Sequence, residues 1–261
     1  MIRAMRTAAS GMMAQQTQVD TIANNIANVN TASFKKNRVN FRSLLYTTLR
    51  EPGATTVGSQ QVPTGLQIGT GTEVSSSVKL FQQGDLEQTS NPFDIGIQGE
   101  GFFRIAIGNG EFRYSRDGSF AKDGNGDLVT ADGYKLDPAI SIPPDALEIV
   151  IGQDGTVQAR SGGSDQFQAL GQIRLTRFPN TAGLRAEGQN LFRETAASGA
   201  PTEQTPGDAG TGLLRQAFLE RSNVSVVDEL IALIQAQRNY EVNSRTIQVS
   251  DEMLQQVSNL I

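Results

Sequence analysis

The N-terminal part of the chain carries a heptad pattern of apolar residues. Four of them recur every seven positions, at Met5, Met12, Val19 and Ile26. A second set follows members of the first by three positions, at Ala8, Ile22 and Val29. This spacing indicates an α-helix whose apolar stripe packs against another helix. We therefore predict a helical assembly segment over residues 1–45, with an ordinary amphipathic helix on a globular core as the alternative.

The same segment is almost free of charge. Asp20 is the one ionisable residue between Thr7 and Phe34, whereas a solvated helix normally carries charge on its outer face. Amide side chains take that place, at Asn24, Asn25 and Asn28. We expect these amides to meet neighbouring copies of the chain, because uncharged groups avoid repulsion between identical subunits and can hydrogen-bond across the contact. A disordered Asn-rich tail is the alternative.

The C-terminal part repeats the heptad pattern. Apolar residues recur every seven positions, at Val226, Leu233, Tyr240, Ile247, Leu254 and Ile261, with Val257 three positions after one of them. Ser225 and Asp228 resemble a capping box at the start of this helix. We predict that residues 222–261 pair with the N-terminal helix in a coiled-coil-like manner. Two helices alone cannot bury such stripes on all sides, so we expect both ends to order on assembly.

The centre of the chain has the pattern of β-structure. Residues 94–107 are rich in Ile and Phe and partly alternate with polar residues. Short strand-like runs follow, separated by turn dipeptides at Asn109-Gly110, Asp117-Gly118, Asn125-Gly126, Asp132-Gly133 and Asp154-Gly155. Such dipeptides are typical of consecutive hairpins. We predict a mixed fold, in which the two terminal helices flank a central all-β domain over residues 73–221, hairpin-rich and sandwich- or barrel-like.

Two stretches have the composition of linkers. Residues 51–72 and 196–212 are dense in Gly, Pro, Ser and Thr. We expect both to lack regular structure. The first forms most of an extended segment, residues 46–72, between the N-terminal helix and the β-domain.

Composition excludes several classes of function. The chain has 261 residues, a net charge of -5, and no Cys, His or Trp. Disulfides, thiolate or imidazole metal sites and histidine catalysis are therefore impossible. The acidic balance argues against nucleic acid as a partner, and no apolar run is long enough for membrane insertion. Residues 1–16 lack the continuous apolar stretch of a cleaved secretory signal.

Each candidate motif for a cofactor or a metal lacks residues that the site requires. The run Asp123 to Asp127 begins like a calcium loop, but Leu128 and Tyr134 stand where Gly and Glu are required. The Gly-rich runs at 69–71 and 99–101 lack the third glycine of a dinucleotide loop. We expect no cofactor, no metal and no catalytic residue, so that the protein is not an enzyme.

Four stretches together resemble the bacterial flagellar rod and hook proteins. Residues 23–31, "ANNIANVNT", with Phe34-Lys35 resemble the N-terminal signature of that family. The run "NPFDIGIQGEGFF", 91–103, is similar to the start of its β-domain, and "YSRDGSF", 114–120, also fits. "LIALIQAQRNYEVNSRTI", 230–247, resembles its C-terminal helix. Ser33 departs from the pattern, because many members have Gly there; a positive φ at this position would cost about 1 kcal/mol.

The resemblance implies a structural subunit of the flagellum. Such proteins build a helical tube that transmits motor torque and encloses the export channel. Residues 46–70 resemble the extra segment of the distal rod branch, and we expect them to stiffen the tube through a set of ring and apolar residues, Tyr46, Pro52, Pro63, Leu66 and Ile68. Another axial protein of the family (proximal rod or hook) and an unrelated β-fibre protein are the alternatives.

The family resemblance also implies the partners and the location. The partners are other copies of the chain, proximal rod proteins, hook protein, P-ring and L-ring proteins and the flagellar export apparatus. The location is the basal body, where the rod crosses the periplasm to the outer membrane, reached by export without a cleaved signal.

Overall fold

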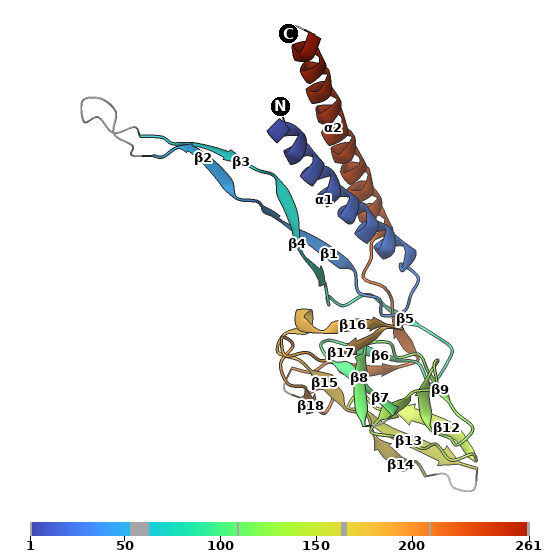
Figure 1. The fold of residues 1–261 in the computed structure, drawn as a ribbon. Helices are drawn as coiled ribbons and strands as arrows, with labels where there is room; N and C mark the ends of the chain where they lie inside the picture. The colour runs from blue at the N-terminus through green and yellow to red at the C-terminus, as the bar shows by residue number, and fades with distance from the viewer. Residues whose placement is uncertain (1, 53–62, 109, 163–165, 209, 260–261) are drawn as a thin grey trace. The chain divides into compact units, whose positions relative to one another are not determined.

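The chain folds into two terminal helices and a β-rich centre (Figure 1). The structure, a computed structural model, describes residues 2–52, 63–108, 110–162, 166–208 and 210–259. It divides into two compact units, each built from separated segments of the chain. The first comprises residues 1–27, 37–78 and 225–261, and the second comprises residues 28–36 and 79–224. The predicted combination of terminal helices with a central β-domain is confirmed.

The first unit contains both helices. Helix α1 (Ile2–Ala27) and helix α2 (Val226–Asn259) lie side by side and run in opposite directions (Figure 1). The amide N–H groups of Asp228 and Glu229 reach the Ser225 hydroxyl at 3.5 Å and the Ser225 carbonyl at 3.0 Å. The predicted start of the C-terminal helix is therefore confirmed. Helix α1 ends before Asn28, where a turn begins.

Two β-ribbons complete the first unit. Strand β1 (Asn37–Ser43) pairs with β4 (Thr72–Lys79), and β2 (Tyr46–Arg50) pairs with β3 (Leu66–Gly69). The expectation that residues 51–72 lack regular structure is wrong for β3 and for the first residue of β4. Apolar side chains alternate along β3, and β2 supplies its hydrogen-bonding partner from outside the Gly- and Pro-rich stretch. Residues 53–62 of that stretch lie outside the described part of the chain.

The main sheet of the second unit is a half-barrel. Its strands follow one another in the order β16 (Arg185–Gly188), β17 (Leu191–Arg193), β8 (Glu111–Ser115), β7 (Phe102–Gly108), β11 (Lys135–Asp137), β10 (Leu128–Thr130) and β9 (Phe120–Lys122). Strand β15 (Leu175–Arg177) joins β7 to β18 (Thr202–Gln204). Because β18 falls within residues 196–212, the expectation of no regular structure there is also wrong.

The second unit also contains smaller sheets. A three-stranded sheet consists of β12 (Ala146–Ile151), β13 (Thr156–Ser161) and β14 (Gln168–Gln172). Two strand pairs join β6 (Ile95–Gln98) to β19 (Leu213–Gln216), and β5 (Leu86–Gln88) to β20 (Phe218–Glu220). A short 3-10 helix, η1, spans Thr181–Gly183.

The core of the second unit lies between these sheets. It contains fully buried aliphatic and aromatic residues such as Ile97, Phe103, Ile105, Leu175 and Leu214. A second cluster contains Leu184 and several aromatic rings. The ring centroid of Phe102 lies 5.4 Å from that of Phe81 and 5.8 Å from that of Phe178, both in edge-to-face contact. Edge-to-face contact aligns the positive ring edge with the negative ring face.

The Asn-Gly and Asp-Gly dipeptides predicted hairpins correctly at most of their positions but not at all of them. Gly126, Gly133 and Gly155 have positive φ angles of 91°, 83° and 83°, and each lies between two paired strands. Asp117-Gly118 is different, because β8 and β9 on its two sides do not pair with each other. A Cβ atom on Gly118 would lie 1.8 Å from the Ile95 carbonyl oxygen. This glycine therefore permits a close backbone approach, and the hairpin predicted there is wrong.

Candidate assembly site

The contact between the two helices uses small and polar residues. A Cβ atom on Gly11 would lie 2.9 Å from the Asn243 side-chain nitrogen, and Asn25 donates to the Glu229 carboxylate at 3.2 Å. These two contacts lie 14 residues apart on each helix, since 25 − 11 and 243 − 229 are equal. The equal spacing is what two antiparallel α-helices of the same rise per residue produce. The residues buried on α1 and α2 are Ala8, Ala14, Ile22, Asn25, Glu229, Ala236 and Ser250.

Asn25 holds three segments of the first unit together. Its side-chain oxygen accepts from the Asn37 amide at 2.9 Å, and its side-chain nitrogen donates to the Asn37 carbonyl at 3.0 Å and to Glu229. The residue is 2% exposed. The expectation of an outward-facing amide is therefore wrong for Asn25, whereas Asn24 is exposed. Asn25 faces inward because it lies next to Asn37, the first residue of β1, whose backbone N–H and C=O groups need hydrogen-bonding partners.

The other predicted assembly residues are only partly covered within the protomer. On α1, Met5, Met12, Val19 and Ile26 are half-buried and Ile22 is fully buried. Asn28 and Val29 lie in the turn after α1 and belong to the second unit, so their placement in the helix was wrong. On α2, three residues are half-buried, namely Leu233, Ile247 and Leu254, and two are exposed, namely Val226 and Tyr240. Ile261 and the side chain of Val257 lie outside the described part of the chain.

A second apolar stripe on α2 was missed in the sequence. It comprises exposed residues, Val227, Ile231, Ile234, Val242, Val249 and Met253, and Arg238 and Arg245 lie among them on the same side of the helix. Val227 is 67% exposed and Ile231 and Ile234 are each 51% exposed. At about 100° per residue, this stripe faces away from the line of Glu229, Ala236 and Ser250 that is buried in the protomer. The spacing of four and three residues from Val227 through Ile231 to Ile234 was the available signal.

The ribbon of β2 and β3 exposes apolar side chains on both strands. They are Leu45, Tyr46, Leu49, Leu66 and Ile68, and Pro52 and Pro63 beyond the paired strands are also exposed. The base of the ribbon is attached to α1, because the Thr72 amide donates to the Ser10 hydroxyl at 3.2 Å. Gly71 has a φ of +125° and lies against Ser10 so closely that a Cβ atom would clash at 2.2 Å. The ribbon therefore presents a fixed base and an uncovered apolar surface.

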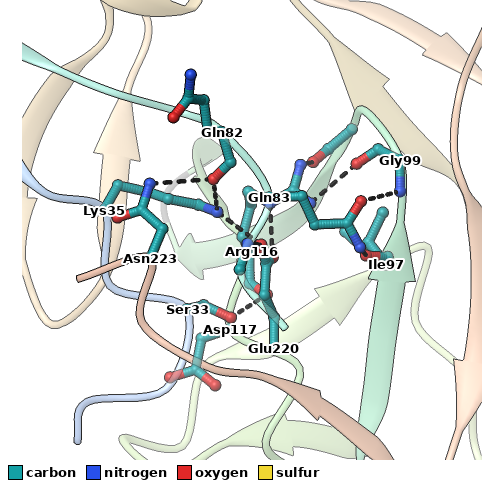
Figure 2. A network of polar contacts seen from close by, with 12 residues as sticks. Ser33, Lys35, Gln82, Gln83, Ile97, Gly99, Arg116, Asp117, Glu220 and Asn223 are labelled. Atoms are coloured by element: carbon teal, nitrogen blue, oxygen red, sulfur yellow. Dashed lines mark hydrogen bonds and ion pairs between the residues drawn. The ribbon is translucent and has the colours of Figure 1, made fainter. Parts of the chain in front are cut away.

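Residues from two of the signature stretches meet Glu220 in a buried ion network in the second unit. Glu220 accepts from the Lys35 ammonium at 2.6 Å and from the Arg116 guanidinium at 2.8 Å, as Figure 2 shows. Arg116 also donates to the carbonyls of Gly99 at 2.9 Å and Gly101 at 3.1 Å. We call Lys35, Arg116 and Glu220 the ion network. It connects residues 28–36 and strand β20 to the β-domain.

The ion network is fully removed from solvent. The side chains of Lys35 and Glu220 are 0% exposed and that of Arg116 is 3% exposed. Burial lowers the pKa of Lys35 from 10.5 to about 8, and the opposing attraction of Glu220 limits the decrease. Removing charges from water is costly unless each has a partner, so the network depends on all three residues.

Ser33 lies beside the ion network in a strained conformation. Its φ is 55°, and it is 2% exposed. The Ser33 hydroxyl donates to the Arg116 carbonyl at 2.7 Å, and the Ser33 amide donates to the Glu220 carbonyl at 2.7 Å. The positive φ considered in the sequence is confirmed. The hydroxyl hydrogen bond offsets part of the strain that a glycine would avoid.

The acidic residues considered as ligands are occupied within the protein. Asp123 accepts from the amides of Asn125 at 2.8 Å and Asp127 at 2.9 Å, which lowers its pKa. Asp127 binds Lys135 at 2.6 Å. Among the described residues, no group of three or more Asp or Glu side chains could hold a metal ion. Within the residues that the structure describes, no helix is both long enough and apolar enough to cross a membrane.

Three family models match this chain, one in its N-terminal part, one in its centre and one in its C-terminal part. Residues 5–35 match the family described as "Flagella basal body rod protein". Residues 96–159 match "Flagellar hook protein FlgE/F/G D1 domain", and residues 215–260 match "Flagellar basal body rod FlgEFG protein C-terminal". These ranges include residues of the helix pair and the ion network.

Several curated relatives match along the whole chain. The flagellar basal-body rod protein FlgG of Caulobacter vibrioides is 47% identical over 260 residues, with 99% of both chains covered. FlgG of Borreliella burgdorferi is 46% identical over 262 residues, covering 100% of this chain and 99% of the relative. FlgG of Buchnera aphidicola subsp. Schizaphis graminum is 45% identical with 100% of both chains covered. The chain belongs to the FlgG family of flagellar basal-body rod proteins.

Proposed function

We propose that the protein is a structural subunit of the distal rod and polymerises into a rigid helical tube that transmits torque to the hook and encloses the export channel. The second apolar stripe of α2 carries this proposal. A helix with apolar stripes on opposite sides needs covering on both, and α1 covers one of them. Another copy of the chain is the natural cover for the second. Contacts between non-equivalent surfaces of identical subunits generate open helical assemblies.

Within the tube, we propose that α1 and α2 form a coiled-coil-like pair that repeats in every subunit. The antiparallel pairing of Gly11 with Asn243 and of Asn25 with Glu229 supports this. Small residues at the contact leave the larger half-buried residues Met12, Val19 and Leu233 available to neighbouring pairs. Repeated burial in a close-packed tube would give it stiffness.

The ribbon of β2 and β3 is proposed to stiffen the tube by bridging to a neighbouring subunit. Its exposed side chains, above all Tyr46, Leu66 and Ile68, supply the apolar surface. Deletion of about 18 residues from 46–70 should give a rod that bends, whereas a deleted rod of unchanged straightness would contradict the proposal. Electron microscopy of isolated basal bodies makes the distinction.

The partners follow from this position in the flagellum. They are other copies of the chain, proximal rod proteins on one side, the hook protein on the other, and the P-ring and L-ring proteins around the tube. The export apparatus would deliver the subunit without cleavage of a signal. Relatives of this chain carry the name of a rod protein, and we assign no catalytic reaction to it.

A substitution in the second apolar stripe tests the proposal. The double variant Ile231→Ser with Ile234→Ser removes two apolar side chains that are each 51% exposed and keeps the buried residues Glu229 and Ala236. The control is Gln235→Ser, an exposed position on the same helical turn. We expect the control to form straight tubes and to restore motility to a strain lacking the gene, and the double variant to remain helical but unassembled. Normal tubes from the double variant would refute the role of this stripe.

A further inference from the structure

A small pocket in the second unit has a basic lining without any carboxylate. It encloses about 170 Å³. One wall is the turn between β16 and β17, with Gln189 and Asn190, and the other contains Phe34, Lys35 and Lys79. In a protein of net charge -5, a pocket lined only by neutral and basic residues is a distinct electrostatic environment.

Lys79 is the cation that this pocket leaves without an acidic partner. Its ammonium lies 5.1 Å from the centre of the Phe34 ring and 3.4 Å from the Lys35 carbonyl. Among the described residues, no Asp or Glu carboxylate forms an ion pair with it. An ammonium has three N–H donors, so a single long hydrogen bond leaves most of its capacity unused. Burial lowers the pKa of Lys79, with no opposing attraction.

Two carboxylates that contact residues of the pocket lining, Glu220 and Asp117, are already engaged. Glu220 accepts from Lys35, Arg116 and the Gly84 amide. Asp117 accepts from Ser119 and from the Asn190 side chain at 3.0 Å. Since no Asp or Glu carboxylate among the described residues is paired with Lys79, an anion from outside the protomer is the partner that we consider.

The opposite wall of the pocket is held in place. Gln189 and Asn190 both have positive φ angles, 51° and 58°, as a two-residue hairpin turn of this type requires. The Asn190 side chain also donates to the Ala32 carbonyl at 3.1 Å. The pocket is thus formed before any ligand enters, which lowers the entropic cost of binding.

We propose that this pocket binds one anionic oxygen group, a carboxylate or a phosphate, against the ammonium of Lys79. The volume suits one such group, and an anion would restore the charge balance that burial of Lys79 disturbs. Two sources share this chemistry: a small anion from solution, and an acidic side chain of a second copy of the chain. The binding step itself does not depend on rod assembly, because the pocket is complete within one protomer.

Binding is tested on the full-length, unassembled protein with inorganic phosphate and acetate. Sodium chloride keeps the ionic strength constant, and NMR of the lysine side chains reports the Lys79 ammonium. We expect a saturable shift of the Lys79 signal with either anion. Lys79→Met should weaken phosphate affinity at least tenfold, measured by the rise of melting temperature with phosphate, while Lys79→Arg keeps most of it.

The control is Lys122→Met, which removes an exposed lysine of the same unit and should leave the affinity unchanged. We expect Lys79→Met to fold normally, because a half-buried ammonium without an acidic partner contributes little to stability; its melting temperature without anion checks this. Equal responses of the wild type and Lys79→Met to phosphate, or no saturable Lys79 shift, would overturn the proposal.

The source of the anion is decided by assembly in the same buffers. If a neighbouring subunit supplies it, Lys79→Met lowers the yield of polymer and phosphate inhibits polymerisation of the wild type in competition. If a free anion supplies it, polymerisation is unchanged by Lys79→Met and unaffected or promoted by phosphate. Both results support the anion site, and a failure of the wild type to polymerise would bear on the proposed function alone.

Discussion

The side chain of Asn25 hydrogen-bonds to both backbone groups of Asn37, accepting from its amide at 2.9 Å and donating to its carbonyl at 3.0 Å. A carboxamide can imitate a paired strand in this way, because it presents one donor and one acceptor side by side. The Asn25 side chain thereby pairs with the first residue of β1 as a neighbouring strand would, and attaches β1 to α1. Its remaining donor reaches Glu229 on α2, so that one side chain fixes the relation of two helices and a strand within the first unit.

Replacement of this side chain should loosen the first unit. Asn25→Ala leaves a backbone donor and acceptor of Asn37 without their partner, at a cost of about 2 kcal/mol in the free energy of unfolding. Urea unfolding followed by far-UV circular dichroism measures the loss, and hydrogen exchange at the Asn37 amide should accelerate. Gln16→Ala, at an exposed position of the same helix, should change stability by less than about 0.5 kcal/mol. Similar effects of both substitutions would contradict this account.

Glu220 should be the least replaceable residue of the ion network. Glu220→Gln leaves Lys35 and Arg116 buried with no anion between them, which we expect to cost about 3–5 kcal/mol. The matched control is Glu87→Gln on the neighbouring strand β5, whose carboxylate is 63% exposed and 3.6 Å from Arg221. The control should cost less than about 1 kcal/mol. Chemical unfolding at pH 7 compares the two, and equal midpoints would exclude an energetic role for the network.

Stability should rise in alkaline solution because of Lys35. The folded protein releases this proton near pH 8 and the unfolded chain near 10.5. Between these values the unfolded state holds more protons, so the free energy of unfolding increases with pH, by up to about 1.4 kcal/mol per unit. Above pH 10, Tyr114 acts in the opposite direction, since its pKa is raised to about 12 in the fold.

The contribution of Lys35 is isolated by comparing Lys35→Met with Lys122→Met across pH 7 to 10. Lys122 is exposed, so its variant keeps the alkaline rise and serves as the reference. The difference in unfolding free energy between the two variants should therefore change steadily with pH. A constant difference over that interval would show that Lys35 stays protonated in the fold.

Ser33 offers a test of strain against hydrogen bonding. Ser33→Ala keeps the unfavourable φ and loses the hydrogen bond to Arg116, and should cost about 1–2 kcal/mol. Ser33→Gly loses the same hydrogen bond but removes the strain, so it should lie within about 1 kcal/mol of the wild type. Thermal unfolding ranks the three proteins. A glycine variant less stable than the alanine variant would show that φ is not the controlling factor.

Local sequence signals predicted the local parts of this fold. The start of α2 follows from Ser225 and Asp228, and the turns at Gly126, Gly133 and Gly155 follow from the need of a hairpin for a positive φ. Asp117-Gly118 shows the limit of this approach. The same dipeptide there serves a close approach to Ile95, and a dipeptide alone does not distinguish a hairpin from a crowded backbone.

The candidate site was predicted less completely, because its partners lie far apart in sequence. The heptads identified the helices, but they did not show that Asn25 faces inward, which depends on Asn37 and Glu229. The ion network was also hidden: Lys35 and Glu220 are 185 positions apart. The second stripe of α2 could have been predicted, since its spacing is helical. The heptad through Leu233 and Tyr240, however, predicts a contact on one side of the helix only.

The long separation of Lys35 and Glu220 has a consequence for damaged or incomplete chains. Contacts between such distant positions form late in folding, since the intervening loop must close first. A fragment that stops short of β20 would bring Lys35 and Arg116 together without the carboxylate that neutralises them, so residues 28–36 would lose their ion pair with β20. The ion network can therefore form only in a polypeptide that continues through Glu220, because that residue supplies its single carboxylate.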